Sequence, residues 1–119
     1  MSLSAYQRVR TISELPRNTE FRLVSQITGE MIAARDAGLK ASDLLATLHR
    51  NREMWGTFAS ACGAPGNALP DELRAGIISL ALWVDRFTSE VVTGREDIDG
   101  LIGVNRQLLE GLAPERAAA

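Results

Sequence analysis

Apolar residues recur at alternating steps of four and three between Leu73 and Val91, and this spacing constrains the fold more than any other feature. Residues spaced in this way fall on one side of an α-helix and form a seam through which helices pack. Ile78, Leu82 and Val92 widen the seam, so we expect this helix to be central and buried over much of its circumference. The seam consists of Leu73, Ile77, Leu80, Val84, Phe87 and Val91.

The other long segments also have helical spacing, and strand signals such as sustained alternation or Asn-Gly turns are missing. Pro16, Gly38, Gly63 and Gly94 mark the expected helix ends, because proline breaks a helix and glycine often closes one. The sequence therefore predicts an all-α, single-domain bundle of about five helices over residues 1–119, with residues 114–119 as a frayed tail. The expected helices cover 4–14, from 18 or 19 to 38, 42–63, 70–94, and from about 97 onward.

Composition is that of an ordinary globular domain. The chain has 119 residues, of which 45% are hydrophobic and 24% charged, with a formal net charge of −2. The most apolar stretch, Ile77–Val84, is far shorter than the ~20 residues that span a bilayer. A single cysteine, Cys62, favours a reducing compartment. We therefore expect a cytoplasmic protein without membrane insertion.

The residues for catalysis are too few. His49 is the only histidine and Cys62 the only cysteine, and they lie roughly 20 Å apart along one predicted helix. This separation excludes a nucleophile–base pair and a metal site built from both. The 63–66 segment lacks the lysine and hydroxyl residue of a phosphate-binding loop. The sequence thus predicts no enzyme activity, no catalytic residue, no metal and no cofactor.

Two tryptophans and two asparagines lie on or beside the apolar stripes. Trp55 and Trp83 would most often be core residues whose indole N–H finds an acceptor, but in an exposed groove they would anchor a partner. Asn51 and Asn105 fall on apolar faces and must be satisfied either inside the protein or by a partner. The sequence leaves both alternatives open.

The loop from Gly63 to Pro70 contains two glycines and two prolines, which excludes a helix interior. It is either a tight connector or a rigid recognition loop. Together with the tryptophans and asparagines, it supplies the residues we select as candidates for partner binding: Trp55, Pro65, Asn67, Trp83, Asn105 and Arg106.

Arginines cluster in the first part of the chain, where Tyr6 and Phe21 could stack on bases. A solvated helical face is the favoured explanation of this cluster, and neither half of the chain is strongly basic. Direct nucleic-acid binding is therefore not expected. The arginines are Arg8, Arg10, Arg17 and Arg22.

Several segments, in order along nearly the whole chain, resemble the FlaF family of flagellar biosynthesis regulators, known from alphaproteobacteria. None of them is a catalytic motif, and the block from Pro65 to Val84 is the most distinctive. The segments are Ala5–Arg8, Asn51-Arg52 with Trp55, Ala64–Pro70, Ile77–Val84 and Ile102–Arg106.

The resemblance implies a role in flagellin synthesis and export beside the regulator FlbT. It favours a cytoplasmic secretion chaperone or adaptor that binds flagellin; the alternative is a post-transcriptional regulator that acts with FlbT on flagellin mRNA translation. A physical hypothesis follows for the first role. The amphipathic helices would leave an apolar groove open after folding, and an amphipathic helix of flagellin would fill it.

Overall fold

Four helices account for nearly all of the structured backbone. The computed structural model describes the backbone of residues 3–112 and the side chains of residues 20–111 except Ala41. The all-α prediction is confirmed, since the described residues contain helices and no strands. The predicted tail, residues 114–119, lies outside the described residues. The helices are α1 (Leu3–Asp36), α2 (Ala41–Gly63), α3 (Asp71–Val92) and α4 (Asp99–Leu112).

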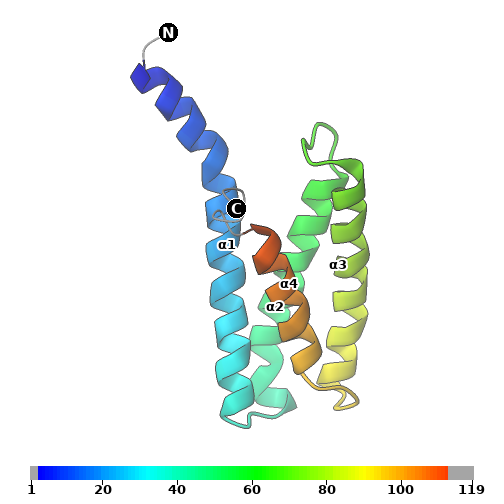
Figure 1. The fold of residues 1–119 in the computed structure, drawn as a ribbon. Helices are drawn as coiled ribbons and strands as arrows, with labels where there is room; N and C mark the ends of the chain where they lie inside the picture. Colours follow the sequence, from blue (N-terminus) through cyan, green and yellow to red (C-terminus); the bar gives the residue numbers. More distant parts are fainter. Residues whose placement is uncertain (1–2, 113–119) are drawn as a thin grey trace.

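The prediction of about five helices is wrong, because the break expected at Pro16 does not occur. The backbone is helical from Leu3 to Asp36, so the two predicted segments form one helix of 34 residues. A proline removes one hydrogen bond and crowds one carbonyl, which bends a helix without ending it when both flanks keep helical geometry. Figure 1 shows the N-terminal part of α1 inclined to the remainder of the helix.

Glycine closes α1 and α3, as the sequence predicts. Gly38 and Gly94 adopt φ values of 71° and 79°, in the left-handed region that other residues disfavour. In each case two backbone bonds close the last turn. At the end of α1, Gly38 N donates to Arg35 O and Leu39 N donates to Ala34 O. The same two kinds of backbone bond close the last turn of α3, after Val91. These are Schellman motifs, which satisfy carbonyls that the helix leaves free.

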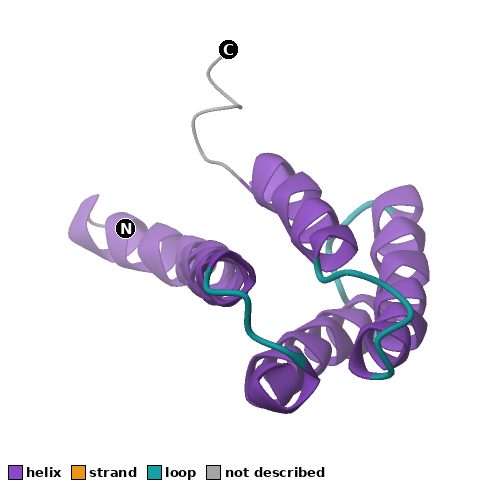
Figure 2. Cartoon of the chain, turned by 90° about the horizontal axis from the view of Figure 1, so that it is seen from below, coloured by secondary structure: helices purple, strands orange, loops and turns teal. Residues whose placement is uncertain are grey.

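The helices run alternately up and down, and each packs against its neighbours in a ring. Contacts join α1 to α2, α2 to α3, α3 to α4 and α4 back to α1. Figure 2 shows the four helices at the corners of this ring, and Figure 1 shows their alternating directions. The molecule measures 57 × 28 × 27 Å. Among the described residues, no helix combines the length and apolarity that crossing a bilayer requires.

The core lies inside this ring, and α3 contributes only one face to it. Val84 is fully buried, whereas the side chain of Leu82 is 62% exposed. The expectation that this helix is central is therefore wrong, because in a four-membered ring every helix has a solvent side. The largest fully buried apolar side chains are Val24, Ile27 and Met31 of α1, Leu48 and Trp55 of α2, Val84 of α3, and Leu101 and Ile102 of α4.

A buried hydrogen-bond network around Asn105 joins three of the helices. Asn105 Oδ1 accepts a bond of 2.8 Å from Trp55 Nε1. Its Nδ2 donates to Asn51 Oδ1 at 2.8 Å and to Thr28 Oγ1 at 3.1 Å. The Thr28 hydroxyl in turn donates to Val24 O at 2.6 Å. This network, with Asn105 from α4, Trp55 and Asn51 from α2 and Thr28 from α1, satisfies polar groups that are otherwise cut off from water.

One donor in the network has no acceptor. Asn51 Nδ2 is buried without a hydrogen-bond partner, which reduces the stability gained from the other bonds. The network therefore determines the relative positions of the helices more than it adds to the free energy of unfolding, because its bonds form only when α1, α2 and α4 are in one register.

Replacing Asn105 with alanine should lower the free energy of unfolding by about 2–4 kcal/mol, because Trp55 Nε1 and Asn51 Oδ1 both lose a buried partner. Trp55→Phe removes one donor and should cost about 1–2 kcal/mol. Urea unfolding followed by circular dichroism measures both. The double variant should lose less than the two single losses combined; strict additivity would show that the bond contributes nothing.

Aromatic packing joins α3 to the start of α4. Trp83 stacks on Phe87 with ring centroids 4.5 Å apart. Phe87 also lies so close to Gly100 that a Cβ added there would fall 2.6 Å from its Cζ. The absent side chain at Gly100 is what lets the two helices approach at this point.

Gly100→Ala should therefore destabilise the protein relative to Gly103→Ala by about 1–3 kcal/mol, since the new methyl must displace the Phe87 ring. Gly103, on the same helix, has no atom within 4 Å of its added Cβ, so Gly103→Ala adds a methyl group to α4 without a steric clash. Thermal unfolding compares them. Equal melting temperatures would mean that Phe87 moves aside freely.

Candidate apolar groove

A groove of about 830 Å³ opens at the end of the bundle where residues 64–70 connect α2 to α3. Among the described residues, α4 does not reach this end. α3 has 22 residues and the described α4 has 14, a difference of about 12 Å at the helical rise. The two helices are antiparallel, so the first turns of α3 extend beyond the last described turn of α4 (Figure 1).

The lining is apolar and its edges are open to solvent. Leu69 and Leu73 are 40% and 50% exposed, whereas Phe58, Ile77 and Leu108 are half-buried deeper in. The complete lining is Glu20 of α1; Phe58, Ala61 and Cys62 of α2; Asn67, Ala68, Leu69 and Pro70 of the loop; Glu72, Leu73, Gly76, Ile77 and Leu80 of α3; and Gln107, Leu108 and Gly111 of α4.

Glycines leave part of the groove unfilled. A Cβ added at Gly76 or Gly111 would meet no atom within 4 Å. Glycine inside a helix is less favourable than alanine by about 1 kcal/mol. Glycine at these two positions therefore lowers the stability of the helices and leaves out side-chain contacts that a larger residue would make. The result is space beside the apolar walls at the positions that face the groove.

The two charged residues of the lining are both acidic. Glu20 comes from α1 and Glu72 from the first turn of α3. A carboxylate at a helix N-terminus is favoured by the helix dipole, which accounts for Glu72 locally. Glu72 thus places negative charge at the edge of an apolar groove.

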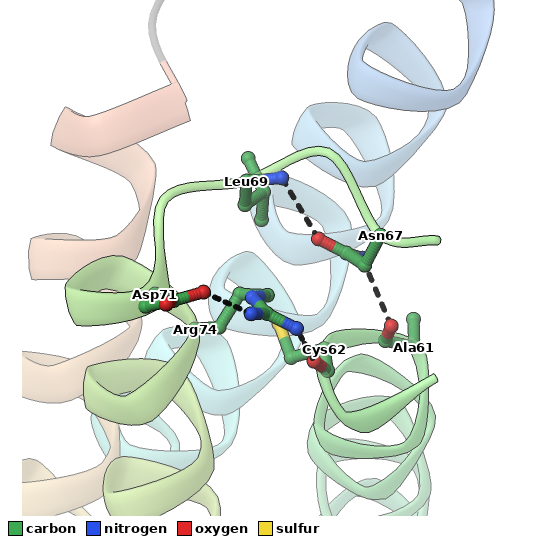
Figure 3. Close-up of polar contacts among 6 residues, drawn as sticks. All are labelled: Ala61, Cys62, Asn67, Leu69, Asp71 and Arg74. Atoms are coloured by element: carbon green, nitrogen blue, oxygen red, sulfur yellow. Dashed lines mark hydrogen bonds and ion pairs between the residues drawn. The ribbon is translucent and has the colours of Figure 1, made fainter. Parts of the chain in front are cut away.

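Asn67 holds the loop that forms the end wall. Its Nδ2 donates to Ala61 O at 2.9 Å, and its Oδ1 accepts from the backbone N of Leu69 at 3.0 Å (Figure 3). One side chain thus closes the end of α2 and turns the chain toward α3. The loop is a tight connector, and through Asn67 to Pro70 it also lines the groove.

Arg74 fastens the same corner from α3. Its guanidinium donates to Cys62 O at 3.3 Å and pairs with Asp71 one turn earlier (Figure 3). The carbonyls at the C-terminus of α2 carry partial negative charge, so a cation at this position is favourable. Asn67 and Arg74 together make this wall of the groove rigid.

Cys62 lies on the floor of the groove with its thiol buried. Burial is the main cause that raises its pKa; the negative charge of Glu20 adds to the increase and Arg74 partly opposes it. The thiol is therefore largely protonated at neutral pH and a poor nucleophile. His49 lies elsewhere on α2, exposed and paired with Glu53 at 2.8 Å. No group of His, Cys, Asp or Glu side chains in the described part of the chain could hold a metal ion.

The structure separates the residues that the sequence selected for partner binding. Asn67 lines the groove. Trp55 and Asn105 are 1% and 0% exposed and hydrogen-bonded to each other, so both are inside the bundle and present no surface to a partner in this conformation.

The remaining three candidates lie outside the groove. Trp83 is half-buried in its stack with Phe87. Pro65 is exposed in the loop, and Arg106 is exposed on α4 beside the lining residue Gln107. They therefore border the groove at most, and none contributes to its lining.

Sequence reasoning missed most of the lining because it assigned those residues to the core. Leu73 and Ile77 belong to the predicted α3 seam, and Leu108 belongs to the apolar face of α4. One signal could have revealed them. The helix predicted from residue 70 to 94 is much longer than the last helix, so the first turns of its seam lack an antiparallel partner.

Comparison with known proteins identifies the family. No curated protein and no solved structure matches the chain. A model of the family described as Flagellar protein FlaF, however, matches residues 2–112, which confirms the resemblance inferred from the sequence. Because this match extends over nearly the whole sequence, the chain belongs to the FlaF family of flagellar proteins.

Proposed function

We propose that this protein is a cytoplasmic secretion chaperone or adaptor that binds flagellin through the groove between α3 and α4. The groove carries the proposal: it is apolar, open to solvent, and lined by all four helices and the loop. Family membership supplies the flagellar context. No acid–base group or cofactor site is needed for this activity, since binding alone shields the guest.

An amphipathic helix is the guest that fits this geometry best. The groove lies beside the first turns of α3, beyond the last described turn of α4. A guest helix would therefore lie in this position and pack its apolar face on Leu73, Ile77 and Leu108. The helical ends of flagellin pair with one another in the filament, so unassembled flagellin needs such a cover for its apolar face.

The acidic edge gives the guest an orientation. Glu72 would favour basic residues beside the apolar stripe of the guest. Because exposed charges contribute little affinity, most of the binding free energy comes from apolar contact in the groove. Binding should then depend weakly on salt.

Control of flagellin synthesis follows as a consequence in this proposal. The fraction of chaperone molecules with a filled groove would rise with the amount of unexported flagellin, and the regulator FlbT would respond to that fraction. The alternative is regulation of flagellin mRNA translation with FlbT by contact with the RNA. Binding would in that case weaken steeply with salt and would not depend on the groove.

Gly76→Leu tests the proposal, because it fills the groove without disturbing the fold. The added side chain enters open space, and leucine is the better helix former. We expect unchanged or higher melting temperature and affinity for monomeric flagellin reduced at least about tenfold, the loss of roughly 1.4 kcal/mol of contact. Isothermal titration calorimetry with purified flagellin gives the affinity.

Gly56→Leu is the matched control. Gly56 is an exposed position on α2, outside the groove, where an added Cβ also meets nothing within 4 Å. This variant should bind flagellin as the unmodified protein does. Failure of the unmodified protein to bind flagellin, or equal binding by both variants, would contradict the proposed function.

A further inference from the structure

The N-terminal end of α1 projects beyond the bundle at the same end as the groove. α1 has 34 residues and α2 has 23, so α1 is longer by about 16 Å at the helical rise. Residues 37–40 join the two helices tightly at the opposite end, which places the excess length beside the groove end. Figure 1 shows α1 extending past the ends of α2 and α3. We refer to residues 3–13 as the arm.

The arm has the sequence of a short amphipathic helix. Ala5, Val9 and Ile12 are spaced by four and three residues, so they share one face of the helical backbone, with Tyr6 beside them. The arm contains two arginines, Arg8 and Arg10, and no acidic residue. An apolar stripe with positive charge is complementary to an apolar groove that has the acidic residue Glu72 at its edge.

We propose that the arm of one molecule docks in the groove of a second copy, and that the second copy returns its arm in the same way. A continuous α1 carries the arm away from the core of its own bundle, so the arm meets another molecule more readily than its own groove. The contact is self-complementary, which a two-fold dimer requires. The docked arm lies beside the first turns of α3, beyond the last described turn of α4.

The contact area sets the strength of this dimer. An arm of about 16 Å with a helix diameter of about 10 Å buries half of its circumference when it docks. Two reciprocal contacts then bury roughly 1,000 Å² in total, the lower limit of a specific interface. The dimer is accordingly weak, with dissociation in the micromolar range, and an apolar guest in the groove would displace the arm. Self-association thereby protects the groove until a guest arrives.

Sedimentation equilibrium of the full chain without flagellin tests the dimer. We expect a monomer–dimer equilibrium at tens of micromolar for the unmodified protein and for Gly56→Leu. Val9→Asp, which puts a charge on the arm stripe, and Gly76→Leu, which fills the groove, should both remain monomeric. Circular dichroism checks that each variant is folded; Val9 lies in the projecting part of α1, so its substitution spares the bundle core.

Cross-linking identifies the contact itself. Ile12→Cys places a thiol on the arm stripe, and Leu73→Cys places a second thiol at an exposed position of the groove wall. In the double variant, mild oxidation should link the two into a species of twice the mass, with position 73 of one copy joined to position 12 of the other, while the buried Cys62 stays reduced. Gln7→Cys, on a different face of the arm, is the matched control and should link at least several-fold less.

A chain that remains monomeric at hundreds of micromolar would overturn the proposal, and so would a dimer that persists in both Val9→Asp and Gly76→Leu. Neither measurement contains flagellin, so the two proposals fail separately. A monomer that binds flagellin would remove only the dimer, and a dimer that ignores flagellin would remove only the chaperone function.

Discussion

The side-chain amide of Asn105 fixes the position of α4, and the rest of the structure follows from that position. Its oxygen and nitrogen bond Trp55, Asn51 and Thr28, so α4 has one register against both α1 and α2. Apolar side chains alone would allow a helix to slide, because dispersion contacts are similar in neighbouring registers. Buried polar groups forbid sliding, because each mismatch leaves a donor or acceptor unpaired. One donor of the network, Asn51 Nδ2, is buried without a hydrogen-bond partner.

The fixed register determines where the bundle is open. Asn105 lies near the middle of the 14 described residues of α4, so anchoring it sets α4 at one end of the bundle. The last described turn of α4 then stops short of the first turns of α3 (Figure 1). Asn67 and Arg74 then hold the loop as a rigid end wall. Gly76 adds space. The groove thus lies where the described part of α4 stops short of the start of α3, an arrangement that the core network maintains. It is preformed, which lowers the entropy lost when a helical guest binds.

Local signals in the sequence predict most of the fold, and long-range relations account for the failures. Gly38 ends its helix as predicted because the left-handed conformation is a property of that residue. Pro16 does not, because a proline can be accommodated by a bend when its flanks stay helical. The need of Asn105 for a buried partner was predictable, but its pairing with Trp55, which lies 50 residues away, depends on packing. Leu73 has the same spacing as core residues but lines the groove, because the described part of α4 does not reach it.

Methyl-resolved NMR of the protein titrated with monomeric flagellin tests the central claim most directly, because it observes the groove and the core in one experiment. The account predicts that the methyl resonances of Leu73, Ile77 and Leu108 shift on addition of flagellin. Those of Leu48 in the core and of Leu82 on the outer face of α3 should stay in place. Perturbations confined to methyl groups outside the groove, or no perturbation at saturating flagellin, would contradict it.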